Sequence, residues 1–244
     1  VLVGDTLFDI QAAVANKIPS IGVKYGYGKD GELLKSTYLA ENADDISDFV
    51  NTCNTMYKVT EKIFQNPIKI VGINGIDTSG KTTFTNLYSK FLHSIGIKST
   101  VIHIDDFHNQ SEIRYCGNNE IEAYYNNAFN YGQLIDEVLQ PLKNNGTLEK
   151  EIFCLDLDTN KYEKKVHISV DSSKILLVEG VLLFRPPLID YFDAKIFLHI
   201  DFDEVIKRAE KRDVPKYGKN FLKKYIDKYI PIQKRYIDEW NPYQ

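Results

Sequence analysis

Hydrophobic residues gather in short runs separated by stretches with helical spacing. Four runs from Ile68 onward have the length and apolar content of buried strands. They lie at 68–73, 99–104, 174–178 and 195–200. Helical patterns separate these runs, and this alternation predicts an α/β fold, in which a parallel sheet carries helices on both faces.

A second pattern occupies the first fifty residues. Residues 1–4 and 21–23 have the apolar content of short strands, and residues 10–15 indicate the start of a helix. Residues 51–66 have helical spacing up to Asn66-Pro67, where the residue before proline disfavours helix. We therefore expect three parts, namely residues 1–50, a helical linker at 51–67 and a larger domain at 68–244.

The strand at 68–73 leads into a glycine-rich loop, since residues 75–82 read GIDTSGKT and match G-x-x-x-x-G-K-[ST]. A helical pattern at 83–93 follows, and strand, loop and helix in this order indicate a phosphate-binding loop. Converging backbone N–H groups and the helix N-terminus attract an anion there. We expect this loop to bind the phosphates of ATP through Gly75, Asp77, Thr78, Ser79, Gly80, Lys81, Thr82 and Thr83.

Acidic residues follow two of the other predicted strands. Asp105 and Asp106 come directly after 99–104, and Glu179 comes after 174–178. Ligands gather at the carboxyl ends of parallel strands, where a carboxylate can accept a proton from an attacking hydroxyl or help to hold Mg²⁺. Two alternatives stay open: one aspartate caps the next segment, and Glu179 is a surface residue.

Basic residues mark the segment after the last predicted strand. Residues 203–212 indicate a helix with Arg208 and Arg212 four positions apart on one face. Paired guanidiniums can clamp phosphates and stabilise a transferring phosphoryl group. Gly218 would allow this segment to end in a mobile lid. A solvated basic helix is the alternative.

Taken together, residues 68–244 resemble the uridine kinase family of P-loop kinases, in its bacterial uridine kinase-like branch. The likeness rests on GINGIDTSGKT, IDDFH, LVEGVLLFRP, R-x-x-x-R-D at 208–213 and KYIPIQKRYIDEWNP. It implies a P-loop kinase-type fold and ATP-dependent phosphorylation of a nucleoside 5′-hydroxyl. Asp105 would be the general base and would also contact Mg²⁺, Thr82 and Glu179 would organise that ion, and Lys81 and Arg212 would stabilise the transferred group.

The same resemblance predicts acceptor contacts from Asp106, Phe107, His108, Arg114, Tyr115 and Tyr125. Several positions depart from the family, since Tyr124 stands where uridine kinases have a ribose-binding Asp, and Asn130 and Leu155 to Leu157 also differ. The tyrosines could stack on a base or fill the core. Other acceptors therefore remain open, such as pantothenate or a sugar phosphate, as does a nucleotide-binding module without catalysis.

Residues 1–50 resemble the last motif of haloacid dehalogenase-like phosphatases, in the phosphoglycolate phosphatase branch, through G-D-T-x-x-D-I-x-A-A. In that family the acids at Asp5 and Asp9 serve a Mg²⁺ site. The family's nucleophilic Asp would precede Val1, and the D-x-D pair at Asp156 and Asp158 comes too late in the chain to replace it. We therefore expect a partial Rossmann-like phosphatase fragment that cannot catalyse alone, and a chain truncated at both ends.

Composition narrows the range of partners. A net charge of −4 over 244 residues argues against a general nucleic-acid binder. The three cysteines have no metal or redox spacing, and no apolar run reaches the length of a membrane span. We expect a cytoplasmic protein with a small-molecule substrate, and leave formation of a homo-oligomer open.

Overall fold

A computed structural model describes residues 1–243, which form two compact units. The first unit comprises residues 1–68, 83–99 and 173–175. The second unit comprises residues 69–82, residues 100–172 and the chain from 176 onward. Gln244, the last residue of the predicted kinase range, lies outside the described residues.

The first unit contains a small parallel sheet in the order β1-β2-β3. The strands at residues 1–4 and 21–23 were predicted, whereas β3 was not. The elements of this N-terminal part are β1 (Leu2–Gly4), α1 (Leu7–Ala15), β2 (Ser20–Val23), α2 (Asp30–Leu33), β3 (Tyr38–Ala40) and α3 (Ala43–Ile63).

Helix α3 overlaps both the predicted fragment 1–50 and the predicted helical linker at 51–67. Its N-terminus is fixed by Asn42, whose side chain accepts a hydrogen bond from the Asp45 backbone at 3.1 Å, while Asp45 accepts one from the Asn42 backbone. Phe49, Cys53 and Met56 then recur at helical spacing and are buried. The helix therefore begins inside the predicted fragment 1–50 and continues through the predicted linker.

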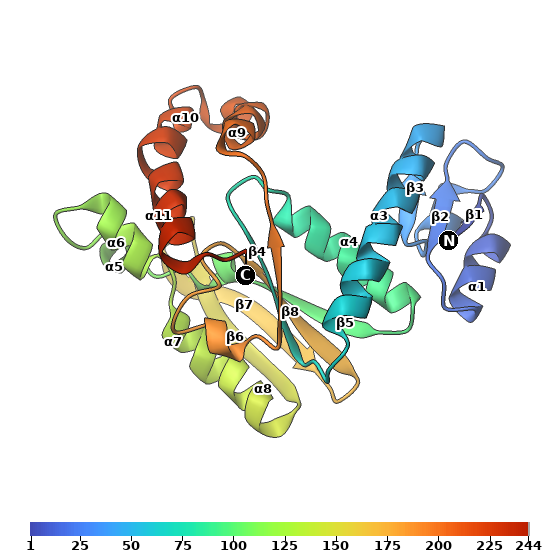
Figure 1. Cartoon of the computed structure of the whole chain (residues 1–244), viewed down its shortest axis with the longest axis horizontal. Coiled ribbons are helices and arrows are strands. Elements are labelled where there is room, and N and C mark those ends of the chain that lie inside the picture. Colours follow the sequence, from blue (N-terminus) through green and yellow to red (C-terminus); the bar gives the residue numbers. More distant parts are fainter. Residues whose placement is uncertain (244) are drawn as a thin grey trace. The chain divides into compact units, whose positions relative to one another are not determined.

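The second unit is built on a four-stranded sheet in the order β5-β8-β4-β9. Figure 1 labels three of its strands, β4, β5 and β8. β8 and β9 both run parallel to β4, which lies between them. All four predicted strands are present, and the predicted α/β fold with a parallel sheet flanked by helices is confirmed. Their bounds are β4 (Ile70–Gly75), β5 (Lys98–His103), β8 (Lys174–Gly180) and β9 (Ala194–Leu198).

Helices and short helical segments connect these strands. Helix α4 (Lys81–Ser94) follows β4, and the helix predicted at 203–212 is part of the longer α9 (Phe202–Tyr217). The remaining segments are η1 (Ile104–Phe107), α5 (Ser111–Arg114), α6 (Glu120–Asn127), α7 (Tyr131–Leu134), η2 (Ile135–Leu139), α8 (Gln140–Asn145), η3 (Ile189–Tyr191), α10 (Phe221–Lys224), η4 (Tyr225–Tyr229) and α11 (Ile230–Trp240).

An antiparallel hairpin of β6 (Leu148–Asp156) and β7 (Lys161–Val170) was not predicted. The D-x-D pair noted in the sequence forms its turn, because Asp156 Oδ1 accepts hydrogen bonds from the backbone N–H groups of Asp158 and Thr159. Asp156 therefore serves as a turn residue.

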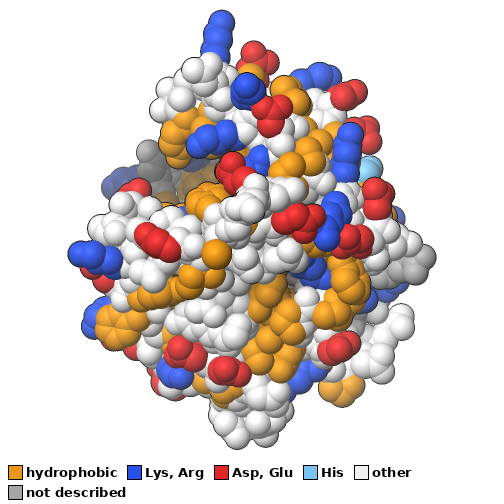
Figure 2. Space-filling model, turned by 90° about the vertical axis from the view of Figure 1, so that its left-hand side faces the viewer, with side chains coloured by type: hydrophobic (Ala, Val, Ile, Leu, Met, Phe, Trp, Pro, Cys, Tyr) orange, Lys and Arg blue, Asp and Glu red, His pale blue; other side chains and the backbone are white. Residues whose placement is uncertain are grey.

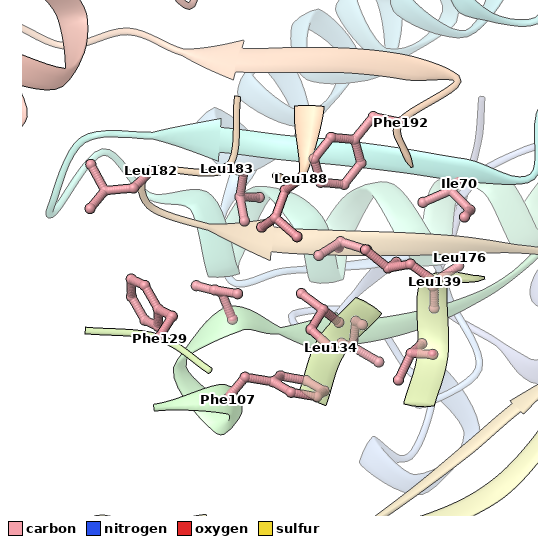
Figure 3. Close-up of a cluster of buried hydrophobic side chains, with 14 of the residues drawn as sticks. Ile70, Phe107, Phe129, Leu134, Leu139, Leu176, Leu182, Leu183, Leu188 and Phe192 are labelled. Carbon is pink, nitrogen blue, oxygen red and sulfur yellow. The ribbon is translucent and has the colours of Figure 1, made fainter. Parts of the chain in front are cut away.

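The main hydrophobic core of the second unit packs the sheet against the segments that follow β5 (Figure 3). Ile70 and Leu176 contribute from the sheet, Phe107 and Phe129 from connecting segments, and Leu134 from α7. Each is at most 3% exposed. This packing anchors the segment that carries Asp105 and so fixes its place at the carboxyl end of β5.

The surface shows no segregation of charge on the face in view: acidic and basic side chains are interspersed there with hydrophobic ones (Figure 2). Within residues 1–243, no helix combines the length and the apolar composition that crossing a membrane requires.

Candidate active site

The phosphate-binding loop, residues 75–82, joins β4 to α4 in a tightly constrained turn. A Cβ on Gly75 would lie 2.7 Å from both Leu198 O and Ser79 Oγ, so only glycine fits there. Thr78 adopts a left-handed conformation with φ of 56°. Lys81 folds back over the loop, and its Nζ donates to Ile76 O at 2.9 Å. These contacts hold the loop in a compact turn between β4 and α4.

Three carboxylates influence the pKa of Lys81. Burial lowers the pKa of Lys81, while Asp77, Glu179 and Asp105 act in the opposite direction by favouring the charged ammonium. Asp77 of the loop and Asp105 line one cavity, and Asp105 favours the charged form of Lys81. These two residues come from the ends of two different strands, as the sequence predicts.

Asp77 is fixed by a residue that the sequence analysis did not assign a role. Its backbone N–H donates to Gln233 Oε1 at 2.9 Å, and Gln233 Nε2 donates to Asp77 Oδ2 at 2.5 Å. Burial raises the pKa of Asp77, although Lys81 acts in the opposite direction. Gln233 lies in the KYIPIQKRY stretch of α11, so this segment supports the phosphate loop from more than 150 positions away.

Thr82 and Glu179, the two residues predicted to organise Mg²⁺, are hydrogen-bonded to each other. Thr82 Oγ1 donates to Glu179 Oε1 at 3.1 Å, and His103 Nδ1 bonds the same oxygen at 2.6 Å, which raises the pKa of His103. The adjacent Gly180 allows close packing, because a Cβ there would lie 2.0 Å from Ile104 Cγ2.

The donor set fits magnesium rather than a metal held by protein alone. No cluster of three or more His, Cys, Asp or Glu suited to a metal occurs in the described part of the chain. Mg²⁺ in nucleotide enzymes is held through one or two protein oxygens together with phosphates and waters. One hydroxyl from Thr82 and one carboxylate from Glu179 match that requirement.

Asp105 and Asp106 are adjacent but have different surroundings. Asp105 is exposed in η1, and within residues 1–243 its carboxylate makes no hydrogen bond or ion pair. Asp106 forms an ion pair with Lys164 at 2.5 Å. Phe107 next to it is completely buried in the core. The carboxylate available for chemistry is therefore that of Asp105.

A cavity of about 260 Å³ opens in front of Asp105. Its walls combine acidic, basic and many aromatic side chains, from segments far apart in the sequence. The lining residues are Asp77, Asp105, His108, Tyr124, Val181, Arg212, Asp213, Tyr217, Phe221, Tyr225 and Tyr229. We call this cavity the reaction pocket.

His108 presents a neutral ring to the reaction pocket. Burial lowers its pKa, with Asp105 acting in the opposite direction. Its ring stacks on Phe129 with centroids 4.6 Å apart, and Nδ1 is 2.9 Å from Ala128 O. Because a carbonyl oxygen only accepts, Nδ1 carries the proton and Nε2 is left as an acceptor.

Arg212 is held rigidly in the reaction pocket. Its Nε and Nη2 donate to the two carboxylate oxygens of Asp213 at 2.8 and 2.9 Å, and Tyr225 bonds both side chains. Arg208 donates from Nη1 to Thr78 O at 3.3 Å and so reaches the phosphate loop. The two predicted arginines therefore lie at different places, since Arg212 lines the cavity and Arg208 contacts the phosphate loop.

A buried lysine organises the aromatic wall. Lys228 is 8% exposed, bonds Glu120 at 2.6 Å, and places its ammonium 4.3 Å and 4.5 Å from the ring centres of Tyr115 and Tyr124. It lies in the π-helical turn η4, a feature frequent at functional sites. The sequence analysis had singled out Tyr115 and Tyr124 of this wall and the KYIPIQKRY stretch, but it assigned Lys228 no role.

Several predicted residues lie elsewhere. Tyr125 lines a different cavity, and Arg114 lies over Tyr115 with its guanidinium carbon 5.3 Å from the ring centre. Thr83 is exposed and belongs to the first unit. The structure therefore brings together the residues predicted for phosphoryl transfer but only some of the predicted acceptor contacts.

In the first unit, Asp5 and Asp9 have local roles. Asp5 Oδ2 accepts from the Tyr27 backbone at 2.6 Å. Asp9 Oδ2 accepts from the backbone and hydroxyl of Thr6, which lowers the pKa of Asp9 and closes a capping box at α1. Both carboxylates are thus used by turns and caps.

Comparison with known proteins points to one family for the larger part of the chain. The model of the phosphoribulokinase / uridine kinase family matches residues 70–239. A uridine kinase of Oceanobacillus iheyensis is 29% identical over 170 residues, which cover 68% of this chain and 76% of that protein. A uridine kinase of Chlamydia pneumoniae is 28% identical over 180 residues, which cover 71% of this chain and 78% of that protein.

A solved structure titled as a possible uridine kinase from Bacillus stearothermophilus superimposes with a TM-score of 0.62 at 23% identity. The match covers 79% of this chain and 95% of the other, and it establishes the fold. Residues 1–50 lie outside the range of the family model, so their phosphatase resemblance stays a prediction.

Proposed function

Because the chain belongs to the phosphoribulokinase / uridine kinase family, we propose that it transfers the γ-phosphoryl group of ATP to a hydroxyl of a nucleoside-like small molecule. One observation carries the proposal. The carboxylate of Asp105, unpaired among residues 1–243, lines the reaction pocket and favours the charged form of Lys81. Phosphoryl transfer is catalysed chiefly by positioning and charge stabilisation, and this pocket offers both.

Asp105 is assigned as the general base. A base must be free to receive a proton from the acceptor hydroxyl, and this carboxylate makes no competing hydrogen bond within residues 1–243. The neutral His108 beside it can accept a second hydrogen bond through Nε2 and so orient the acceptor. Because the reacting hydroxyl has a single proton, which Asp105 would receive, His108 would accept from a different donor group of the acceptor molecule.

Lys81 and Arg212 are assigned to the charge that develops on the transferred group. Lys81 would contact the terminal phosphates from the loop, and Arg212 faces the same pocket, fixed in place by Asp213. Mg²⁺, held by Thr82 and Glu179, would supply neutralisation of the phosphate charge. The preformed bidentate pair of Arg212 reduces the reorganisation required during transfer.

The aromatic wall supports an acceptor with a flat ring. Five aromatic side chains line the reaction pocket in addition to His108, and aromatic side chains stack on nucleobases. We therefore place uridine and cytidine first among acceptors, and pantothenate and sugar phosphates as alternatives on the same scaffold.

The test is release of ADP from ATP and Mg²⁺ in a coupled assay with a panel of uridine, cytidine, pantothenate and fructose 6-phosphate. Acceptor-dependent release, strongest with a pyrimidine nucleoside, is expected. Strongest release with another acceptor would retain the kinase and correct the substrate. Tight ATP binding with no acceptor-dependent release would instead indicate a nucleotide-binding module.

For residues 1–50 we propose a phosphatase-type fragment without its own activity, supported by the parallel strands β1 to β3 and by the position of Asp5 after β1. We expect the wild-type chain and Asp5→Asn to hydrolyse p-nitrophenyl phosphate at the same rate, within the background. A lower rate in Asp5→Asn would contradict the proposal that this fragment has no activity of its own.

A further inference from the structure

A cavity of about 250 Å³ lies within the first unit and shares no lining residue with the reaction pocket. Its walls come from α1, from β2, from residues 34–37 between α2 and β3, and from the C-terminal half of α4. We call it the lysine cavity, because Lys35 and Lys90 both line it. A larger cavity of about 480 Å³ adjoins it, since the two share Lys90 and three residues of 34–37.

The lysine cavity has an excess of positive charge. Lys35 and Lys90 line it, whereas no aspartate or glutamate that the structure describes does so. Among the described side chains, neither ammonium group has an ion-pair or hydrogen-bond partner. Glu32 is three positions before Lys35, yet it lines neither this cavity nor the adjoining one. The two positive charges are therefore not balanced within the walls.

Two buried hydroxyl groups also line the lysine cavity. Ser20 and Thr37 are 2% and 5% exposed, and each side chain accepts a hydrogen bond from the other's backbone N–H, at 3.2 and 3.1 Å. Their own O–H protons have no acceptor among the described residues, and a buried donor without an acceptor is costly. His93 Nε2 accepts from the Ser99 N–H at 2.9 Å, so Nδ1 is the ring nitrogen that can donate. The cavity therefore offers several donors beside its two ammonium groups.

Apolar side chains line the adjoining cavity. Tyr38, Leu39 and Leu87 contribute there, and Leu34 lines both cavities. The volume of about 480 Å³ is within the range of small-molecule sites. One ligand can therefore place an anionic group beside the lysines and an apolar part in the neighbouring space.

We propose that the lysine cavity binds the phosphate group of a small phosphate monoester, with the apolar part of that molecule in the adjoining cavity. A phosphate monoester carries about 1.5 to 2 negative charges at pH 7 and presents three acceptor oxygens. Lys35 and Lys90 match that charge, and the hydroxyl groups of Ser20 and Thr37 match the oxygens. The inference does not rest on the proposed kinase activity, because the reaction pocket has separate walls.

Calorimetric titration of the whole chain tests the proposal, with phenyl phosphate, inorganic phosphate and the neutral benzyl alcohol as probes. Ionic strength is held constant, because the charges of exposed lysines are screened by salt. A saturating non-hydrolysable ATP analogue with Mg²⁺ is present throughout, so that residues 75–82 are occupied. Lys81→Ala checks the same point, since it alters the phosphate loop and neither of the two cavities.

We expect saturable binding of phenyl phosphate. Inorganic phosphate lacks the apolar contacts and benzyl alcohol lacks the charge, so each should bind more weakly by about tenfold or more. Lys35→Met and Lys90→Met keep an apolar side chain but remove the charge, and each should weaken phenyl phosphate by about tenfold. Lys58→Met is the matched control, because Lys58 is an exposed lysine of α3 that lines neither cavity. Lys58→Met and Lys81→Ala should leave the affinity unchanged.

Several results would overturn the proposal. They are no saturation by phenyl phosphate up to about 10 mM, equally tight binding of benzyl alcohol or of inorganic phosphate, an unchanged affinity in Lys35→Met or in Lys90→Met, and a loss of affinity in Lys58→Met or Lys81→Ala. Should a variant of the lysine cavity fail to fold, the three probes on the wild-type chain still decide whether the site requires both the charge and the apolar part.

Discussion

The reaction pocket has a phosphate wall and an aromatic wall, and the two come from different kinds of segment. The phosphate wall comes from Asp77 of the loop and from Asp105, each just after a strand, and Glu179 at the end of β8 accepts a hydrogen bond from Thr82 of the same loop. The aromatic wall is assembled from Tyr124 and from Tyr217, Phe221, Tyr225 and Tyr229. The first wall follows strand ends, whereas the second comes from helical segments far apart in the sequence.

This difference has a physical origin. A loop that binds an anion through its backbone requires particular residues at single positions, and here these are Gly75 and Lys81. An aromatic wall needs only area and charge balance, which many residues can supply. The phosphate wall should therefore control turnover, and the aromatic wall should control acceptor affinity and stability.

The largest expected effect is on the phosphate wall. Asp105→Asn keeps the shape of the side chain but cannot accept the proton, so kcat should fall about a hundredfold to ten-thousandfold in the coupled assay, with KM for ATP little changed. Asp106→Asn is the matched control, since Asp106 is engaged by Lys164, and it should retain most of the turnover. An equal fall in kcat in the two variants would contradict the assignment of Asp105, and not Asp106, as the general base.

The aromatic wall is tested by Lys228→Met. Loss of the ammonium between Tyr115 and Tyr124 should cost about 2 kcal/mol in the free energy of unfolding and raise KM for the acceptor more than it lowers kcat. Denaturant unfolding and steady-state kinetics measure the two quantities. Lys223→Met, on an exposed side chain, should change stability by less than about 0.5 kcal/mol. A fall in kcat alone would place Lys228 with the phosphate wall.

The support of the phosphate loop by α11 predicts a smaller effect. Gln233→Ala removes both hydrogen bonds to Asp77, so KM for ATP should rise about tenfold while KM for the acceptor stays within about twofold. Both constants come from the same assay. An unchanged KM for ATP would show that the loop keeps its shape without this contact.

The smallest effect concerns pH. Because burial lowers the pKa of His108 below the ordinary 6.5, its neutral form contributes stability that is present above 6.5 and is lost as pH falls through the lowered pKa. His108→Asn cannot titrate, so its thermal midpoint should fall less than that of the wild type between pH 7.5 and about 5.5. His103, whose pKa is raised, contributes with the opposite sign in both proteins and cancels. Parallel curves would contradict the assignment.

The same contrast explains what the sequence could predict. Strand periodicity was sufficient to place the four strands of the larger sheet, and the residues after them pointed to Asp105 and Glu179, while the glycine-rich motif pointed to Lys81. The hairpin of β6 and β7 was missed because much of it is exposed, with little apolar alternation to mark it.

Long-range partners were harder to predict. Gln233 and Lys228 are polar residues in an amphipathic segment, and only the fold shows that they contact Asp77 and Glu120. Tyr125 follows Tyr124 directly, yet successive helical residues point in different directions, and it lines a separate cavity instead of the reaction pocket. Such choices depend on packing across the chain, which a local pattern does not encode.

The most direct measurement is a crystal structure with a non-hydrolysable ATP analogue, Mg²⁺ and uridine. We expect the terminal phosphate on Lys81 and an acceptor hydroxyl about 2.6–3.2 Å from the Asp105 carboxylate. An acceptor bound with its hydroxyl turned away from Asp105, or a triphosphate seated away from residues 75–82, would contradict it.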